Sequence, residues 1–214
     1  MTVPADVGAK LHKLMPVSRE TLERLDHLVQ GIAKWSPQIN LVADSRPETV
    51  WSRHVLDCAQ LFRYCDPTAR HWCDLGAGGG FPGLVVACLA AEKAPGMRFA
   101  LIESDRRKAA FLLLTARELG LACRVLPERI EAAERQGADI VSARALAPLS
   151  RLLGLVERHL APRGVALLQK GQRSIEEIIA AQRDWAFTVE SFDSIVDGES
   201  RILRVTDLRS VDAN

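Results

Sequence analysis

The sequence DLGAGGG at residues 74–80 is a glycine-rich loop that directly follows a short apolar segment, HWCDL at residues 71–75. Four of the five residues from 76 to 80 are glycine, so the backbone can pass close to a ligand without a side-chain clash. We expect a buried strand at residues 71–75 and a helix at about residues 81–91, whose N-terminal N–H groups face the loop. Ligands of α/β proteins bind at the carboxyl ends of parallel strands, where this loop would lie. The pattern therefore predicts a site for a nucleotide-like ligand.

The residues around the glycines favour S-adenosylmethionine over a dinucleotide. The pattern GxGxxG at residues 78–83 also fits dinucleotide-binding proteins, but a single match of this kind is weak. Asp74 stands two residues before Gly76, where an acid can meet the amino-acid part of S-adenosylmethionine, whereas a pyrophosphate would gain nothing from it. Pro82 is expected to start the helix, which would place Gly83 inside the helix and not at its mouth. The loop residues predicted to bind this cofactor are Asp74, Gly76, Gly78 and Gly80.

A second acid is expected at the end of the next strand. Glu103 follows the strand-like segment 97–102, so its carboxylate can accept hydrogen bonds from both ribose hydroxyls of a nucleotide. Both S-adenosylmethionine and a dinucleotide carry such a ribose. Glu103 is therefore a predicted cofactor contact that does not decide between the two ligands.

Strand-like and helical segments alternate along the second part of the chain, which predicts a parallel sheet with helices on both faces. The last two strands are expected to pair around residues 197–198, so that one late strand lies antiparallel. The fold class is α/β, Rossmann-like, with a mostly parallel seven-stranded sheet. The expected strands are residues 71–75, 97–102, 122–126, 139–142, 165–169, 187–195 and 201–205, and the later expected helices are residues 105–119, 148–160 and 174–182.

The first third of the chain predicts a helical extension. Residues 1–16 are expected to form a loose start, and Ser18 is a plausible N-cap for a helix that runs to about residue 35 and stops at Ser36-Pro37. Another helix is expected from Pro47 to about residue 64. We therefore divide the chain into an N-terminal helical extension, residues 1–66, and a cofactor-binding domain, residues 67–214.

Composition excludes several classes of protein. Of 214 residues 48% are hydrophobic and 26% charged, and the formal net charge is +1, which is ordinary for a globular domain. The five cysteines include no CxxC pair, so neither a disulfide framework nor a metal site is expected. The longest apolar run spans residues 84–91, and the first residues do not resemble a signal peptide. We expect a cytoplasmic protein without membrane contact.

Several segments, read together, resemble the RsmG (GidB) family. The resemblance covers roughly residues 18–206, and its most specific part is the FPG tail of the glycine loop. Cys58 departs from the pattern, because a serine is expected there. The segments that carry the resemblance are GAGGGFPG at residues 76–83, NLVA at 40–43, RHVLD at 53–57, SDRRKAAFL at 104–112, SARA at 142–145 and QKG at 169–171.

The resemblance implies a class I methyltransferase that transfers a methyl group from S-adenosylmethionine to N7 of a guanine in 16S ribosomal RNA, of the guanine 527 type in the 530 loop. It implies as partner the 16S ribosomal RNA within the 30S subunit, and nothing demands more than a monomer. The residues that fall at cofactor-contacting positions of the family are Gly76, Phe81, Ile130, Glu131 and Arg144.

The chemistry of such a reaction needs no general base, because guanine N7 carries a lone pair and no proton. Catalysis would rest on placing N7 in line with the methyl group. Arg144 and Lys170 are candidates for positioning the substrate. The segment SARA at residues 142–145 stands where enzymes that methylate exocyclic amines carry an Asn/Asp-Pro-Pro-aromatic segment, which argues against that reaction.

Basic residues near the predicted site are candidates for RNA binding. Arg106, Arg107 and Lys108 begin a helix, an end that disfavours cations, so a functional role is more plausible there. For His54 two interpretations stay open. Its side chain faces the pocket for RNA or cofactor, or it packs in the core. The full set of RNA-binding candidates is His54, Arg106, Arg107, Lys108, Arg144 and Lys170.

Three alternative functions stay open at this point. A methyltransferase for a small molecule or a protein would use the same cofactor. An NAD-dependent dehydrogenase would use the GxGxxG pattern for a dinucleotide. A non-catalytic RNA-binding module would not need the full cofactor loop.

Overall fold

A seven-stranded sheet of order β3-β2-β1-β4-β5-β7-β6 forms the centre of the computed structural model, which describes residues 3–211. The first five strands are parallel, and β7 lies antiparallel between β5 and β6. The predicted strand number and the late antiparallel insertion are therefore confirmed. The strands are β1 (His71–Leu75), β2 (Arg98–Ile102), β3 (Cys123–Leu126), β4 (Ala138–Arg144), β5 (Leu160–Lys170), β6 (Trp185–Asp193) and β7 (Arg201–Ser210).

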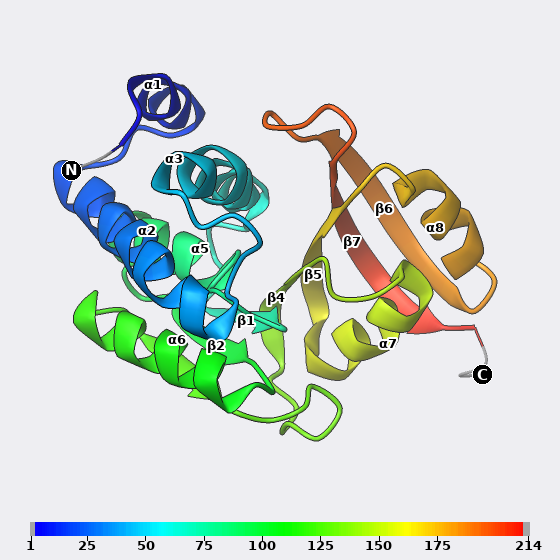
Figure 1. Cartoon of the computed structure of the whole chain (residues 1–214). Helices are drawn as coiled ribbons and strands as arrows, with labels where there is room; N and C mark the ends of the chain where they lie inside the picture. The colour runs from blue at the N-terminus through cyan, green and yellow to red at the C-terminus, as the bar shows by residue number, and fades with distance from the viewer. Residues whose placement is uncertain (1–2, 212–214) are drawn as a thin grey trace.

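Helices cover both faces of this sheet, as the alternating pattern predicts. In Figure 1, α2 (Arg19–Ile39), α5 (Gly83–Lys93) and α6 (Arg106–Glu118) lie together on one side, and α7 (Leu149–His159) and α8 (Ser174–Ala181) lie on the other. Alternate residues of β1 face the two sides, since Trp72 packs with α5 and Cys73 packs with α7. The central strands β1 and β2 are therefore buried on both faces, which explains why their segments read as continuous apolar runs, whereas the edge strand β6 has no buried residue.

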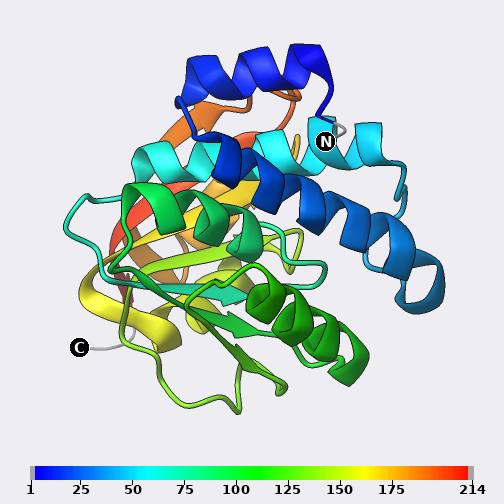
Figure 2. The ribbon, with the colours of Figure 1, turned by 90° about the vertical axis from the view of Figure 1, so that its left-hand side faces the viewer.

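The helical extension packs directly onto the sheet domain. It contains α1 (Ala5–Leu14), α2 and one helical segment made of α3 (Pro47–Thr49), the π-helix η1 (Val50–Val55), α4 (Leu56–Ala59) and the 3₁₀-helix η2 (Gln60–Tyr64). Figure 2 shows α1 and this segment stacked above the rest of the molecule. Leu28 and Ile32 of α2 share a buried core with Leu84 of α5.

The structure corrects two predictions for the extension. The expected loose start contains α1, because Val7 and Leu11 lie on one face of that helix and are buried. The second helix does not stop at Pro37 but runs to Ile39. Pro37 removes one backbone donor, and the helix continues for only two more residues before it ends at Asn40, whose φ of 50° is left-handed.

Three boundaries near the sheet also differ from the predictions, and one of them is the end of β7, which lies at Ser210 and not near residue 205. β5 begins at Leu160 and not near residue 165, because an irregularity in its pairing with β4 accommodates the segment around Pro162. Helix α5 begins at Gly83, two residues later than expected. Within residues 3–211, no helix is both long and apolar enough to cross a membrane.

Candidate functional site

The glycine loop lies where the strand order reverses, between β1 and its two neighbours β2 and β4. The chain leaves β1 toward β2 on one side and later enters β4 on the other, so no crossover covers the carboxyl end of β1. This arrangement creates a crevice at the switch point of α/β sheets, which is the common position of their ligands. Gly76 and Gly78 line the crevice with positive φ angles of 67° and 53°, which glycine adopts without strain.

Asp74 is buried beneath the glycine loop and does not line the crevice. Its side chain is fully buried, its Oδ2 accepts a hydrogen bond from the N–H of Gly83 at 2.9 Å, and its Oδ1 accepts one from Ser142 at 2.7 Å. The Ser142 hydroxyl in turn accepts a hydrogen bond from the indole N–H of Trp72 at 2.8 Å. Burial raises the pKa of Asp74 to about 7. In place of the expected contact with the cofactor, this carboxylate ties β1 to the start of α5 and to β4.

Gly83 occupies the mouth of α5, contrary to the expectation that it lies inside the helix. Its N–H bonds the Asp74 carboxylate, and a Cβ at Gly83 would lie 2.6 Å from that carboxylate oxygen and 2.5 Å from Leu101 Cδ2. The close packing of strand, loop and helix leaves no room for a side chain here. The physical requirement for glycine is therefore space, because no left-handed φ is recorded for Gly83.

Glu103 connects the end of β2 to the glycine loop. Its Oε2 accepts a hydrogen bond from the N–H of Gly78 at 2.9 Å, and its Oε1 accepts one from the N–H of Asp105 at 2.7 Å. These two bonds hold the carboxylate at the edge of the crevice, where it is one of the lining residues. Each carboxylate oxygen keeps a further lone pair that a ribose hydroxyl can use. Contact between Glu103 and a ribose stays a prediction.

A cavity of about 390 Å³ opens at this crevice. Predicted site residues form much of its wall: Gly76, Gly78, Glu103, Lys108, Ile130 and Glu131. Ile130 is buried and presents an apolar wall, whereas Glu131 is exposed and lies 3.7 Å from Arg151. The cavity is large enough for a nucleoside-sized ligand and has the polar and apolar walls that such a ligand requires.

Four predicted cofactor residues lie outside this lining, namely Asp74, Gly80, Phe81 and Arg144. Gly80 has a φ of 90°, and a Cβ there would lie 2.7 Å from Leu84, so this glycine serves the turn into α5. Phe81 is buried, and its ring lies 5.1 Å from the ring of His54. Gly80 therefore shapes the loop, and Phe81 forms part of its contact with the helical extension.

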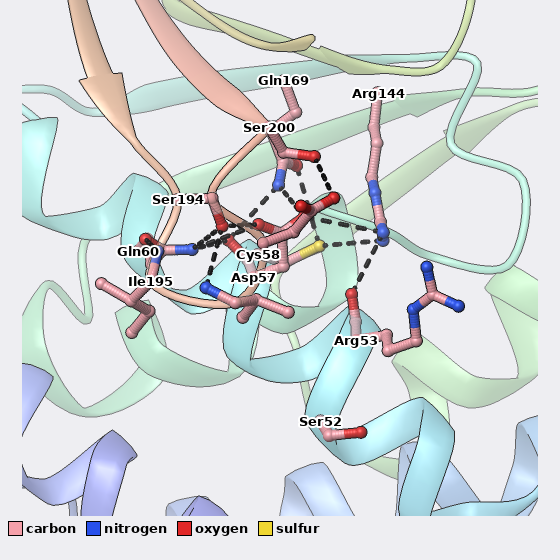
Figure 3. Close-up of polar contacts among 12 residues, drawn as sticks. Ser52, Arg53, Asp57, Cys58, Gln60, Arg144, Gln169, Ser194, Ile195 and Ser200 are labelled. Carbon is pink, nitrogen blue, oxygen red and sulfur yellow. Dashed lines mark hydrogen bonds and ion pairs between the residues drawn. The ribbon is translucent and has the colours of Figure 1, made fainter. Parts of the chain in front are cut away.

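Arg144, at the end of β4, joins a polar cluster between the sheet and the extension (Figure 3). Its guanidinium lies 3.6 Å from the carboxylate of Asp57, donates to the carbonyl of Arg53 at 3.2 Å, and contacts the sulfur of Cys58 at 3.7 Å. The side chain keeps 21% of its surface exposed. Arg144 is therefore anchored at the edge of the site and still open on one side.

Asp57 is the centre of this cluster, and its carboxylate has four polar neighbours. Oδ2 accepts a hydrogen bond from Gln169 at 2.6 Å, and Oδ1 accepts bonds from Ser194 at 2.8 Å and Gln60 at 3.1 Å. Burial raises the pKa of Asp57, which the Arg144 charge opposes. The cluster joins the extension, β4, β5 and the β6–β7 loop, four segments that are far apart in the sequence.

His54 lies next to the glycine loop as a neutral side chain. Its Nδ1 is buried and has no hydrogen-bond partner among the described residues. Burial and the charges of Arg144 and Arg53 lower its pKa to about 4. At neutral pH His54 therefore offers a hydrogen-bonding nitrogen and not a positive charge.

Lys170 is held inside the protein and does not extend toward solvent. Its ammonium lies 2.6 Å from Glu177 and donates to the carbonyl of Ala147 at 2.7 Å, with 8% of the side chain exposed. Glu177 also accepts a hydrogen bond from the N–H of Leu149, the first residue of α7. In place of the expected RNA phosphate contact, Lys170 fixes Ala147, which lines the cavity.

The three cations at the start of α6 are placed differently from one another. Arg106 and Arg107 are exposed, whereas Lys108 is half-buried and lines the cavity. The carboxylate of Asp105 caps the helix by accepting hydrogen bonds from the N–H groups of Arg107 and Lys108. Asp105 therefore compensates for cations at an unfavourable helix end.

Sequence reasoning did not find several residues of the site. Leu146 and Ala147 line the cavity after a turn at Ala145, whose φ of 48° is left-handed although it is not glycine. Arg129, between β3 and β4, and Arg151, on α7, also line the cavity, and only the fold shows that they lie close together. No group of three or more His, Cys, Asp or Glu side chains within residues 3–211 could hold a metal ion.

Comparison with known proteins agrees with this geometry. A family model described as GidB, rRNA small subunit methyltransferase G, matches residues 21–203. The chain belongs to this family. The protein named ribosomal RNA small subunit methyltransferase G of Cereibacter sphaeroides is 47% identical over 197 residues, 92% of this chain and 96% of its own length. The protein of the same name from Ruegeria pomeroyi is 46% identical over 195 residues, 91% and 95% of the two chains.

Solved structures with low sequence identity share the fold. A methyltransferase from Geobacter sulfurreducens has a TM-score of 0.57 at 16% identity and covers 95% of this chain and 96% of its own. A protein described as a SAM-dependent methyltransferase from Aquifex aeolicus has a TM-score of 0.55 at 12% identity, with 74% and 92% covered. The predicted Rossmann-like methyltransferase fold is therefore confirmed.

Membership of the family also confirms the resemblance found in the sequence. It assigns the chain to the ribosomal RNA methyltransferases that use S-adenosylmethionine, and the dehydrogenase and the non-catalytic module are set aside.

Proposed function

We propose that this protein transfers the methyl group of S-adenosylmethionine to N7 of a guanine in 16S ribosomal RNA, with the small ribosomal subunit as substrate, as a monomer in the cytoplasm. The observation that supports this most is the cavity at the carboxyl ends of β1, β2 and β4, lined by the glycine loop and Glu103, in a chain of the rRNA small subunit methyltransferase G family.

The residues of the cavity fit the cofactor. Glu103 has free lone pairs for the ribose hydroxyls, and Gly76 and Gly78 let the backbone approach the ligand. Ile130 provides an apolar surface for a purine ring, and its neighbour Glu131 borders the same wall. When bound, S-adenosylmethionine supplies a methyl group on a positively charged sulfur. Asp74, Gly80 and Phe81 act on the cofactor through the shape of the loop.

The substrate guanine is expected on the side of the cavity where the loop after β4 and the helical extension meet. Arg144 and His54 lie at this junction, beside Phe81. Arg144 can donate to the O6 edge of a guanine or to a phosphate, and neutral His54 adds no charge beside a ring that becomes cationic on methylation. In this proposal, residues 1–66 form one side of the substrate site and residues 67–214 carry the cofactor.

No side chain has to remove a proton from the substrate, because the N7 lone pair attacks the methyl carbon directly. The protein contributes by holding the guanine and the cofactor in line, which is an effect of proximity and orientation. Arg106, Arg107 and Lys108 are positioned to attract the RNA backbone, and this attraction would weaken with salt.

A methyl-transfer assay tests the proposal. The purified protein is incubated with isotope-labelled S-adenosylmethionine and, separately, with unmethylated small subunits, protein-free 16S ribosomal RNA, and total cell protein. We expect label in the RNA, at a nucleotide where borohydride reduction followed by aniline treatment cleaves the RNA chain, as it does at an N7-methylated guanine. Label only in protein or small molecules would contradict the proposal.

A further inference from the structure

The first turn of α6 directs its three consecutive cations toward three different hollows. Lys108 lines the cofactor cavity, Arg107 lines a groove between α2 and α6, and Arg106 lines a depression between α6 and the end of β3. The groove beside Arg107 has a volume of about 280 Å³ and is here named the Trp35 groove. The residues that line it are Trp35, Ile39, Arg107, Ala110, Phe111 and Leu114.

Large apolar side chains of the Trp35 groove are exposed to solvent. Trp35 keeps 38% of its surface exposed and Leu114 keeps 44%. Phe111, which is 4% exposed, forms a buried floor, and its ring would lie 3.5 Å from a Cβ at Gly31 of α2. The groove walls are therefore set by tight packing of α2 against α6, so the hollow exists before anything binds.

Charges at the rim of the groove are mainly positive. The ammonium of Lys34 lies 5.9 Å from the centre of the Trp35 ring. The guanidinium of Arg107 is 3.6 Å from Asp105, and its side chain keeps 69% of its surface exposed. The carboxylate of Asp105 is also used by two backbone N–H groups, so it neutralises Arg107 only in part.

We propose that the Trp35 groove binds an unpaired nucleotide of the RNA substrate close to the methylated guanine, with its base stacked on Trp35 and its phosphate on Arg107. This inference rests on the proposed function. An exposed aromatic ring with a cation at its side is the combination that holds single-stranded nucleic acid, since every base offers a π-face. Arg107 and Lys108 are adjacent residues, so the groove and the cofactor cavity open at the same end of α6.

RNA fits this groove better than a protein segment does. A helix that docks through apolar contacts alone gains nothing from the cations at the rim, whereas a phosphate gains from Arg107 and Lys34. A ribosomal protein as the occupant is therefore an outcome for the test to exclude.

Fluorescence of the full chain gives a direct measurement. Trp51 and Trp72 are fully buried and Trp185 is half-buried, so Trp35 is the indole most open to a ligand. We expect a short unpaired RNA with the sequence of the substrate loop to quench the tryptophan emission, and the same RNA annealed to its complement to quench it much less. The Trp35→Phe variant should lose the quenching while keeping most of the RNA affinity, because a phenyl ring still stacks.

Affinity and activity complete the test. Trp35→Ala should weaken binding of the unpaired RNA about tenfold, which is within the range for loss of one stacked base, and should raise KM for RNA with unchanged affinity for S-adenosylmethionine. Ile175→Ala, which truncates an exposed apolar side chain on α8, is the matched control and should leave both values unchanged. Arg107→Gln should reduce the salt dependence of RNA binding by about one phosphate contact.

Two results would overturn the inference. RNA affinity and quenching that are the same in the wild type and Trp35→Ala would show that no base stacks there. Loss of affinity for small subunits, with unchanged affinity for protein-free RNA, would identify a ribosomal protein as the occupant. Either result can arise while the wild type methylates RNA, so the inference can fail without failure of the proposed function.

Discussion

The guanidinium of Arg144 lies 3.6 Å from the carboxylate of Asp57, so the end of β4 is ionically joined to the helical extension. The two side chains are 21% and 12% exposed, which limits screening by solvent. Asp57 is itself fixed by Gln169 and Ser194. The orientation of Arg144 at the edge of the site thus depends on residues that do not contact the cavity.

Asp57→Asn tests whether this orientation matters for the reaction. The variant keeps the size of the side chain but removes the charge that holds Arg144, so we expect methyl transfer to fall roughly tenfold, a loss of about 1.4 kcal/mol of transition-state stabilisation. The measurement is kcat/KM on small subunits, with thermal unfolding measured in parallel. Asp6→Asn, which removes an exposed ion pair with Lys10 on α1, is the control. A folded Asp57→Asn protein with wild-type kcat/KM would show that methyl transfer does not depend on the pairing of Arg144 with Asp57.

The buried carboxylate of Asp74 predicts a pH dependence of stability. Its pKa rises from the ordinary value of 3.8 to about 7 in the folded protein. Between these two values the folded state binds more protons than the unfolded state, so the free energy of unfolding should fall as pH rises from about 4 to about 7 and then level off. Urea unfolding at a series of pH values measures this slope.

Asp74→Asn is the matched variant for that measurement. An asparagine can still accept a hydrogen bond from the N–H of Gly83 and donate one to Ser142, but it does not titrate. The difference in unfolding free energy between wild type and variant should therefore change with pH in the same window. A difference that is constant from pH 4 to 7 would argue against a raised pKa.

Gly83→Ala should destabilise the protein by roughly 1–3 kcal/mol, the usual result of overpacking. The new methyl group would lie 2.5 Å from Leu101 and 2.6 Å from the Asp74 carboxylate, so the glycine loop must shift. We expect weaker binding of S-adenosylmethionine by calorimetry as well. Gly96→Ala is the control, because no atom lies within 4 Å of a Cβ there. Equal stability of the two variants would contradict the packing argument.

Lys170→Met should act on stability and not on the electrostatics of RNA binding. It leaves Glu177 without its cation at 2.6 Å and Ala147 without a donor, so we expect a loss of roughly 2 kcal/mol. The salt dependence of RNA affinity should match the wild type. Arg173→Gln, which removes an exposed pair with Glu176, should leave stability nearly unchanged. A smaller salt slope in Lys170→Met would restore Lys170 as a phosphate ligand.

Local sequence patterns predicted much of the fold. The apolar runs of β1, β2 and β3 and the glycine that follows α6 depend on residues close together in the chain, and their boundaries agree with the structure to within a few residues. One of the errors has a local cause, and the other depends on tertiary contacts. Pro37 is tolerated because it lies near the end of α2, and α1 forms because the protein offers a surface that buries Val7 and Leu11.

The predictions for the site also divide into those that rest on neighbouring residues and those that depend on the fold. Glu103 and three glycines of the loop, Gly76, Gly78 and Gly80, were predicted because a strand end and a glycine turn are signals carried by adjacent residues. Of these four residues, all but Gly80 line the cavity. The sequence predicted that Lys170 and Asp74 contact a ligand. In the structure, Lys170 pairs with Glu177, and Asp74 accepts a hydrogen bond from Gly83. These internal contacts depend on partner residues that only the fold brings close.

The sequence by itself determined the α/β architecture, the cofactor loop and the family, because strand periodicity, glycine spacing and motif order act through neighbouring residues. Only the tertiary structure decided which charges face a ligand. It paired Arg144 with Asp57 across 87 positions of the chain, left His54 neutral, and opened the Trp35 groove between α2 and α6. Burial and ion pairing are set by the three-dimensional surroundings of a group, and the residues that create those surroundings lie far away in the sequence.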